Sequence, residues 1–277
     1  MLAAVLGVSA AVLGSALPAS ATINPDGGVV VTTPQRICGK TLYEPVHTQG
    51  TYFDVYNGAG TCMTVNGSLS MSNIAVQPGT GAGWQYPNIS SGWQWGRNPC
   101  SGHSGTCFTY PVQLSTVLRS YKPRSGMQTT AGTGAHNSAW DIWFDPTPRT
   151  NGQVTGTEIM IWLSHPGISV GGGQTWYTKI DGLEFEANEW VTHHNGASWR
   201  YVRYVAVHQM PRGVGGLWLN PFFQNAISHR VLSSAWYLTS LDAGFEIPVS
   251  SPSAAAKAGH GMSMTYYTLA GLPSSKG

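Results

Sequence analysis

Two glutamates, Glu158 and Glu246, are the residues whose type and setting best suit chemistry in this 277-residue chain, which has only twelve acidic residues. Both lie in strand-like segments. Cleavage of a glycosidic bond uses one carboxyl group on each side of the scissile bond, and a retaining enzyme places the two roughly 5 to 5.5 Å apart. Two carboxyls that close cannot both ionise easily, so one keeps its proton and serves as the acid.

The period-2 alternation of a strand places Glu158, Met160 and Trp162 on one face and three aliphatic residues on the other. In the second segment, Glu246 shares a face with Asp242, opposite an apolar face. A solvated glutamate on an exposed strand face is the ordinary alternative. Strands rarely expose a large side chain such as Trp162 to water, so the pattern favours a cleft beside Glu158.

Three runs carry a family resemblance: AWDIWFDPTP at residues 139–148, TEIMIWL at 157–163 and WYLTSLDAGFEI at 236–247. They resemble the signature strands of glycoside hydrolase family 12, which comprises small secreted endo-β-1,4-glucanases and xyloglucanases. The likeness extends from about residue 38 to residue 267. It implies an all-β fold, a β-jelly roll of two stacked antiparallel sheets with a substrate groove on one of them, and a retaining double displacement.

Carried over residue by residue, the resemblance makes Glu158 the nucleophile and Glu246 the acid/base. Asp141 matches a carboxylate that hydrogen-bonds the nucleophile, although a strand-end residue before the turn at 145–146 is the alternative. Met160 matches a methionine that lies between the two catalytic carboxylates. Asn57, in an abbreviated N-terminal motif, is a further substrate-binding candidate.

Aromatic side chains would supply the rest of a sugar site, because the apolar faces of pyranose rings stack on them. The candidates for lining a groove are Trp143, Trp162, Trp84, Trp93 and Trp95. Alternation places Trp93 and Trp95 on one face, where a position in the core is equally consistent. The core is the expected place for Trp176, Trp199 and Trp218.

The chain departs from the family after Glu246. The family continues with a tryptophan and a Gly-Gly turn, whereas here the run PVSSP occupies residues 248–252. We therefore expect no stacking aromatic beside the acid/base, and Pro248 is expected to break the strand ladder. A groove with fewer stacking platforms would suit branched xyloglucan or mixed-linkage glucan better than crystalline cellulose.

Composition excludes other functions. A net charge of +2 without a basic run argues against nucleic-acid binding. The sequence contains no Cys-x-x-Cys pair of the kind that binds zinc, so no metal site is expected. Hydrolysis by water requires no cofactor. With 11% aromatic residues and 35 glycines, the chain reads as a rigid, turn-rich extracellular domain, expected to be monomeric. The rival function is a non-catalytic β-glucan-binding jelly roll, although such a module would not need both glutamates and Asp141.

Residues 1–21 are apolar and end in Ala-Ser-Ala, which predicts a secretory signal peptide, with a membrane anchor of about 20 residues as the alternative. Residues 22–36 are expected to form a flexible lead-in, and residues 37–277 one catalytic domain without a membrane segment. Four cysteines fit secretion and allow three pairings. The family resemblance supports Cys38 with Cys62 and Cys100 with Cys107.

Local signals predict two elements and exclude one. Asn-Gly at 195–196 predicts a β-hairpin. One short helix is predicted from Asn220 as the N-cap, with Pro221 in the first turn and an apolar stripe, ending before Ser233 and packing outside the sandwich. The run at 167–171 matches the Gly-x-Ser-x-Gly pattern of serine esterases through Ser169, but the glycines that follow cannot start the helix that this motif requires.

Overall fold

The computed structural model describes residues 22–23, 29–30, 35–39, 43–48, 51–57, 61–66, 69–78, 80–93, 96–101, 106–130, 132–194, 196–250 and 259–276. The signal peptide predicted at residues 1–21 and the groove candidate Trp95 lie outside these residues. None of the described helices has the length and apolar character needed to span a membrane.

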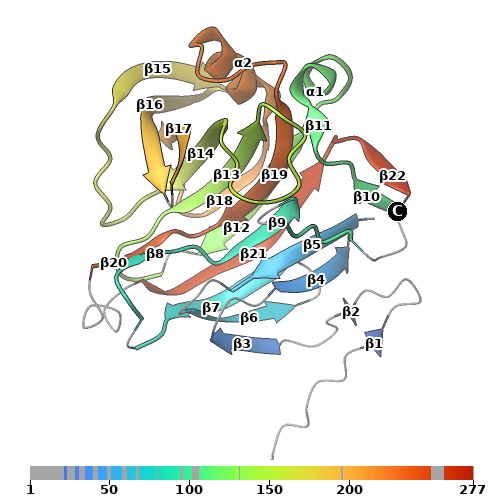
Figure 1. The fold of residues 1–277 in the computed structure, drawn as a ribbon. Helices are drawn as coiled ribbons and strands as arrows, with labels where there is room; N and C mark the ends of the chain where they lie inside the picture. Colours follow the sequence, from blue (N-terminus) through green and yellow to red (C-terminus); the bar gives the residue numbers. More distant parts are fainter. Residues whose placement is uncertain are drawn as a thin grey trace, which may run out of the picture.

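Two stacked sheets make up most of the described structure (Figure 1). The larger has ten strands, in the order β15 (Gln174–Ile180), β16 (Leu183–His194), β17 (Ala197–Ala206), β14 (Thr157–Ser164), β13 (Ser138–Asp145), β19 (Tyr237–Gly244), β9 (Asn88–Gly92), β5 (Thr51–Tyr56) and β4 (Tyr43–Thr48), with β11 (Val112–Gln113) also paired to β19. The smaller has six, in the order β18 (Gly213–Trp218), β12 (Arg124–Thr130), β21 (His260–Ala270), β7 (Ser70–Val76), β6 (Thr61–Asn66) and β3 (Gln35–Gly39). Three short pairs complete the fold: β1 (Thr22–Ile23) with β2 (Val29–Val30), β10 (Thr106–Phe108) with β22 (Ser274–Lys276), and β8 (Gly83–Gln85) with β20 (Ile247–Val249).

The expected all-β sandwich is confirmed, and two details differ from the expectation. Strands β14 and β17 pair in parallel, so the ten-stranded sheet is not purely antiparallel. The expected lead-in at 22–36 includes the β1–β2 pair, and β3 begins at Gln35, inside it.

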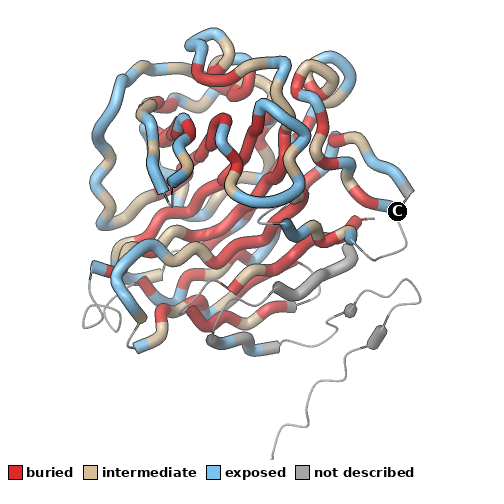
Figure 2. The backbone as a smooth tube through the Cα atoms, viewed as in Figure 1, coloured by how far each residue is buried: buried red, intermediate tan, exposed pale blue. Residues whose placement is uncertain are grey.

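The core lies between the sheets and follows the alternation of the strands. Ile159, Ile161 and Leu163 of β14 are fully buried in it, as are Trp140 of β13 and Met127 of β12. The central strands of the sandwich are accordingly coloured mostly as buried in Figure 2. The Trp140 indole N–H donates to the Ser125 hydroxyl at 2.8 Å and so connects the two sheets. Because one face of β14 is committed to this core, Glu158 must lie on its opposite face.

Two helices lie at the edge of the sandwich, where one was expected. Helix α2 (Asn220–Ser228) buries Phe222, Phe223 and Ala226, which confirms its predicted apolar stripe. Asn220 is not the N-cap: it is the first helical residue, and its side-chain amide donates to the carbonyl of Tyr121 at 2.9 Å. Helix α1 (Leu114–Ser120) was missed because its seven residues bury only two side chains, too few to show a helical period.

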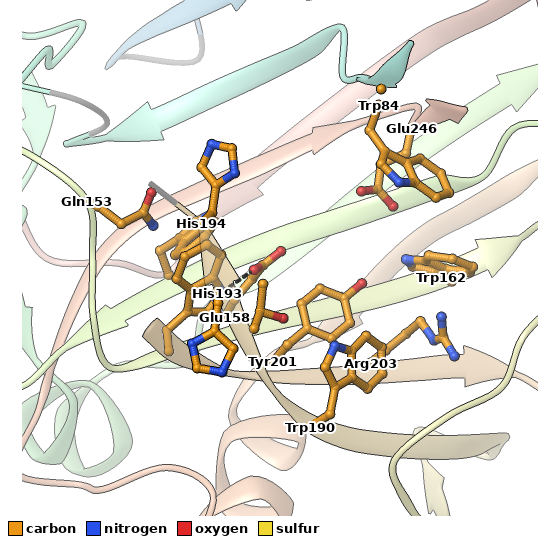
Figure 3. Close-up of a pocket in the computed structure, with 14 residues that line it drawn as sticks. Trp84, Gln153, Glu158, Trp162, Trp190, His193, His194, Tyr201, Arg203 and Glu246 are labelled. Atoms are coloured by element: carbon orange, nitrogen blue, oxygen red, sulfur yellow. Dashed lines mark hydrogen bonds between the residues drawn. The ribbon is translucent and has the colours of Figure 1, made fainter. Parts of the chain in front are cut away.

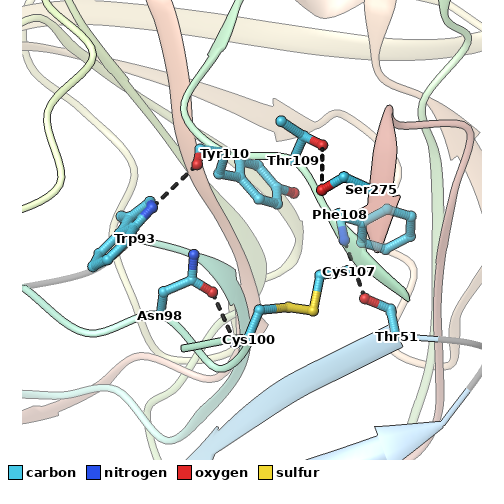
Figure 4. The surroundings of a disulfide bond; sticks show 9 residues. All are labelled: Thr51, Trp93, Asn98, Cys100, Cys107, Phe108, Thr109, Tyr110 and Ser275. Carbon is cyan, nitrogen blue, oxygen red and sulfur yellow. Dashed lines mark hydrogen bonds between the residues drawn. A yellow bond between two sulfur atoms is a disulfide. The ribbon is translucent and has the colours of Figure 1, made fainter. Parts of the chain in front are cut away.

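Both disulfides pair as the family resemblance implied, Cys38 with Cys62 and Cys100 with Cys107. The first joins directly opposed residues of β3 and β6. The second lies beside β10, where the Asn98 side chain accepts from the Cys100 N–H at 2.9 Å and Thr51 accepts from the Phe108 N–H at 3.2 Å (Figure 4). The bond to Thr51 anchors the segment before α1 to strand β5.

The remaining local predictions can be compared directly with the structure. Strands β16 and β17 pair with His194 opposite Ala197, which confirms the hairpin. Gly167 to Gly171 leads into strand β15 and not into a helix, so the esterase interpretation of Ser169 is excluded. Trp176 packs against the core as predicted, whereas Trp218 is 42% exposed and lies beside Arg124.

Candidate active site

A cavity of ≈ 610 Å³ opens on the face of the ten-stranded sheet that points away from the core. Its floor comes from β13, β14 and β17, and its rim from β8, β16 and the segment after β19. The described residues that line it are Gly83, Trp84, Trp143, Gln153, Glu158, Trp162, Trp190, Thr192, His193, His194, Trp199, Tyr201, Arg203 and Glu246. Both predicted catalytic glutamates therefore face one space, from segments far apart in the sequence (Figure 3).

Glu158 stands on β14 directly between Trp143 of β13 and Tyr201 of β17. Only 7% of it is exposed, and the Trp199 indole N–H donates to its Oε2 at 2.5 Å. Burial and the nearby Asp141 carboxyl raise the pKa of Glu158, while the Trp199 hydrogen bond acts in the opposite direction. Trp199 is thus the group in the cavity that favours the ionised, attacking form of Glu158.

Glu246 is held by Asn137, a residue that no sequence pattern singled out. The Asn137 side-chain N–H donates to Glu246 Oε2 at 2.5 Å, and its side-chain oxygen accepts from the Glu246 backbone N–H at 2.9 Å. Burial raises the pKa of Glu246 to about 7, although Asn137 and the Arg203 charge oppose the shift. Near neutral pH this carboxyl can therefore both donate and accept a proton, as an acid/base requires.

Asp141 and Met160 lie behind the cavity and not on its lining. Asp141, 6% exposed, stands opposite Met160 on one side and Asp242 on the other. No hydrogen bond joins Asp141 to Glu158 within the described part of the chain, so their coupling is electrostatic: the Asp141 carboxyl raises the pKa of Glu158. Burial and Glu246 in turn raise the pKa of Asp141. The sulfur of Met160 accepts the Tyr201 hydroxyl at 2.9 Å and so fixes that ring beside Glu158.

The described aromatic candidates divide into two groups, and Asn57 belongs to neither. Trp143, Trp162 and Trp84 line the cavity, and Trp84 is 55% exposed. Trp93 instead packs against the core and donates its indole N–H to the Tyr110 carbonyl at 3.1 Å. Asn57 is fully buried, accepts the Thr61 hydroxyl at 2.8 Å and does not line the cavity.

Two expectations about this region are wrong. Trp199 was assigned to the core but lies in the cavity wall, with its ring 5.5 Å from that of Trp143. Pro248 does not break the ladder: it belongs to β20 and pairs opposite Trp84 of β8. A two-stranded edge ribbon tolerates proline, and its partner strand brings to the rim near Glu246 the aromatic that the sequence after Glu246 lacks.

Comparison with known proteins agrees with this geometry. The model of glycosyl hydrolase family 12 matches residues 53–265. The chain belongs to this family. It is therefore a glycoside hydrolase, as the resemblance of its three motifs implied.

Relatives in the family are moderately similar. The probable cellulase Cel12b of Mycobacterium tuberculosis is 34% identical over 137 residues, which are 49% of this chain and 85% of that protein. Endoglucanase S of Pectobacterium parmentieri is 28% identical over 169 residues, 58% of this chain and 59% of that protein. The fold matches endoglucanase Cel12A from Rhodothermus marinus with a TM-score of 0.66 at 24% identity, over 86% of this chain and 100% of that one.

Proposed function

We propose that this protein is a retaining, endo-acting hydrolase of β-1,4-glucan linkages in plant cell-wall polysaccharide. The observation that carries the proposal is that two buried carboxyls, from segments far apart in the sequence, face one cavity. Burial raises the pKa of both: that of Glu246 to about 7, which lets it carry a proton near neutral pH, while the Trp199 indole N–H opposes the rise at Glu158. The names of the relatives, a cellulase and an endoglucanase, support a β-glucan as substrate.

In the first half of the reaction, Glu158 attacks the anomeric carbon and forms a covalent glycosyl ester. Glu246 gives its proton to the departing glycosidic oxygen. In the second half, Glu246 takes a proton from water, the water oxygen bonds to the anomeric carbon, and the bond to Glu158 breaks. Water is the only co-reactant, so no metal or cofactor enters the proposal.

Secretion is part of the proposal. The apolar leader at residues 1–21 and the two disulfides are both typical of an exported protein. The mature enzyme would begin near residue 22 and act as a monomer on polysaccharide outside the cell. Residues 37–277 would form its single catalytic domain.

Reducing-sugar release by the purified protein from mixed-linkage β-glucan, xyloglucan and carboxymethyl-cellulose tests this function. Proton NMR in the first minutes of the reaction is expected to show the β-anomer, because two displacements retain configuration. Initial formation of the α-anomer would instead mean an inverting enzyme. If no sugar is released while the protein is still retarded in a polysaccharide-containing gel, the site binds glucan without cleaving it.

The value of kcat/KM is expected to fall as the pH rises through about 7. Glu246 must be protonated to act as the acid, and its raised pKa of about 7 keeps the proton in place at lower pH. Initial rates on a soluble β-glucan between pH 4 and 9 measure this decrease, the basic limb of the pH profile of kcat/KM. An aryl glycoside whose leaving group needs no proton is the control, because its first step should show no such decrease.

A further inference from the structure

Arg203 lies on the cavity side of the ten-stranded sheet and has no place in the two-carboxylate mechanism. It stands on β17 opposite Met160 of β14 and opposite Asn188 of β16, and only 5% of it is exposed. Among the described lining residues it is the only lysine or arginine. Burying a cation costs free energy unless its surroundings compensate, so its presence here requires a reason.

Two tryptophans and two oxygens hold the guanidinium. Its central carbon lies 4.6 Å from the centre of the Trp162 ring and 5.1 Å from that of Trp190. Nη2 donates to Asn188 Oδ1 at 3.1 Å and to the Gly171 carbonyl at 3.2 Å. Cation–π attraction is strongest where water is excluded, so Arg203 fixes both indoles in the wall (Figure 3).

The side-chain packing around Arg203 continues to the catalytic residues. Trp190 packs on Tyr201 with ring centres 4.3 Å apart, and Tyr201 bonds to Met160 and stands beside Glu158. In the other direction, Trp162 lines the same cavity as Glu246. Arg203 thus contacts two indoles that line the same cavity as the two carboxyls.

The charge of Arg203 is not used in an ion pair. No carboxylate lies within 4.0 Å of it in the described part of the chain, and its Nε is buried without a hydrogen-bond partner there. Its field nevertheless reaches Glu246 and lowers the pKa of that carboxyl.

Most other groups near Glu246 favour its neutral form or carry no charge. Among the described residues, the carboxyls of Glu158 and Asp141 and the hydroxyls of Tyr86 and Tyr201 interact electrostatically with Glu246, and Asn137 is the neutral donor. The imidazoles of His193 and His194 line the same cavity. An acid/base must reach both protonation states in each turnover. Among the described residues that line the cavity, only Arg203 places a permanent positive charge where it stabilises the carboxylate state.

We propose that Arg203 is a positioning residue of this active site, which holds the Trp162 and Trp190 wall and supplies the charge that lets Glu246 give up its proton. The proposal rests on the proposed glycosidase function. Arg203 acts through its neighbours and forms no bond to the reacting atoms.

Two variants separate the two roles. Arg203→Met removes the charge and the planar stack, and we expect the basic limb of kcat/KM to move up by about one pH unit, because an opposite charge lowers a carboxyl pKa. Arg203→Lys keeps the charge but loses the stack, so we expect the wild-type limb with KM raised about fivefold. Thermal unfolding of each variant establishes that it is folded.

The proposal is overturned if folded Arg203→Met keeps the wild-type limb, or if Arg203→Lys shifts the limb as much as Arg203→Met does. Carbon NMR of protein labelled at the glutamate carboxyls gives an independent readout, in which the titration of Glu246 should move to higher pH in Arg203→Met. This measurement needs no turnover. An inactive wild type would therefore contradict the proposed function while the role of Arg203 is still tested.

Discussion

Glu158→Gln is expected to fold normally and to lose at least about 10⁴-fold in kcat on soluble β-glucan, because removal of a nucleophile removes the covalent route altogether. Glutamine preserves the shape of the side chain and can still accept the Trp199 N–H through its amide oxygen. It cannot attack the anomeric carbon. Reducing-sugar release measures the loss, and retardation in a β-glucan gel measures whether the cavity still binds substrate.

Glu184→Gln is the matched control, since Glu184 lies on β16 with an exposed side chain outside the cavity. The same chemical change there should leave kcat unchanged. Turnover by Glu158→Gln within a few-fold of the wild type would show that another group is the nucleophile. A loss of both activity and the folding transition would point to a structural role for Glu158, and Glu158→Ala would then be compared.

Strand alternation predicted much of this fold and site. The aliphatic face of β14 had to enter the core, and this alone placed Glu158 and Trp162 on the opposite face. Burial of that opposite face was also anticipated from the tryptophan. The alternation could not reveal which strands are neighbours, so the meeting of Glu158 and Glu246 in one cavity depended on the family resemblance.

The residues that hold the carboxyls were not predicted, although one signal was present. Alternation along β17 places Trp199, Tyr201 and Arg203 on a single face, an arginine among aromatics, which is the same kind of pattern that singled out Glu158. Asn137 offered no such signal. Its bonds to Glu246 span 109 positions of the chain and exist only because β13 begins beside the end of β19.

The error over Pro248 has a physical explanation. Proline lacks an N–H and breaks a ladder only where that N–H is needed. Among the described strands, β20 pairs with β8 alone, so its ladder can leave one position without a bond. The pairing places Trp84 at the cavity rim, and the expected shortage of stacking aromatics near Glu246 is thereby reduced.

Glu246→Ala is expected to lower kcat on β-glucan by about 10³-fold, in the range for loss of a general acid. On an aryl cellobioside with a good leaving group, the first step should continue without the acid, and the glycosyl ester on Glu158 should then accumulate because no base activates water. Added azide, which attacks without a base, should restore turnover. A burst of aryl alcohol followed by a slow steady state measures the accumulation.

The configuration of the azide product decides which glutamate has which role. In Glu246→Ala, azide attacks the ester on Glu158 after one inversion, so the product should be the β-glycosyl azide. In Glu158→Ala, azide would replace the missing nucleophile directly, and a single inversion of the β-linked substrate would give the α-glycosyl azide. An α product from Glu246→Ala and a β product from Glu158→Ala would reverse the assignment, whereas the expected pair of products also requires that both carboxyls act on opposite sides of one sugar in this cavity.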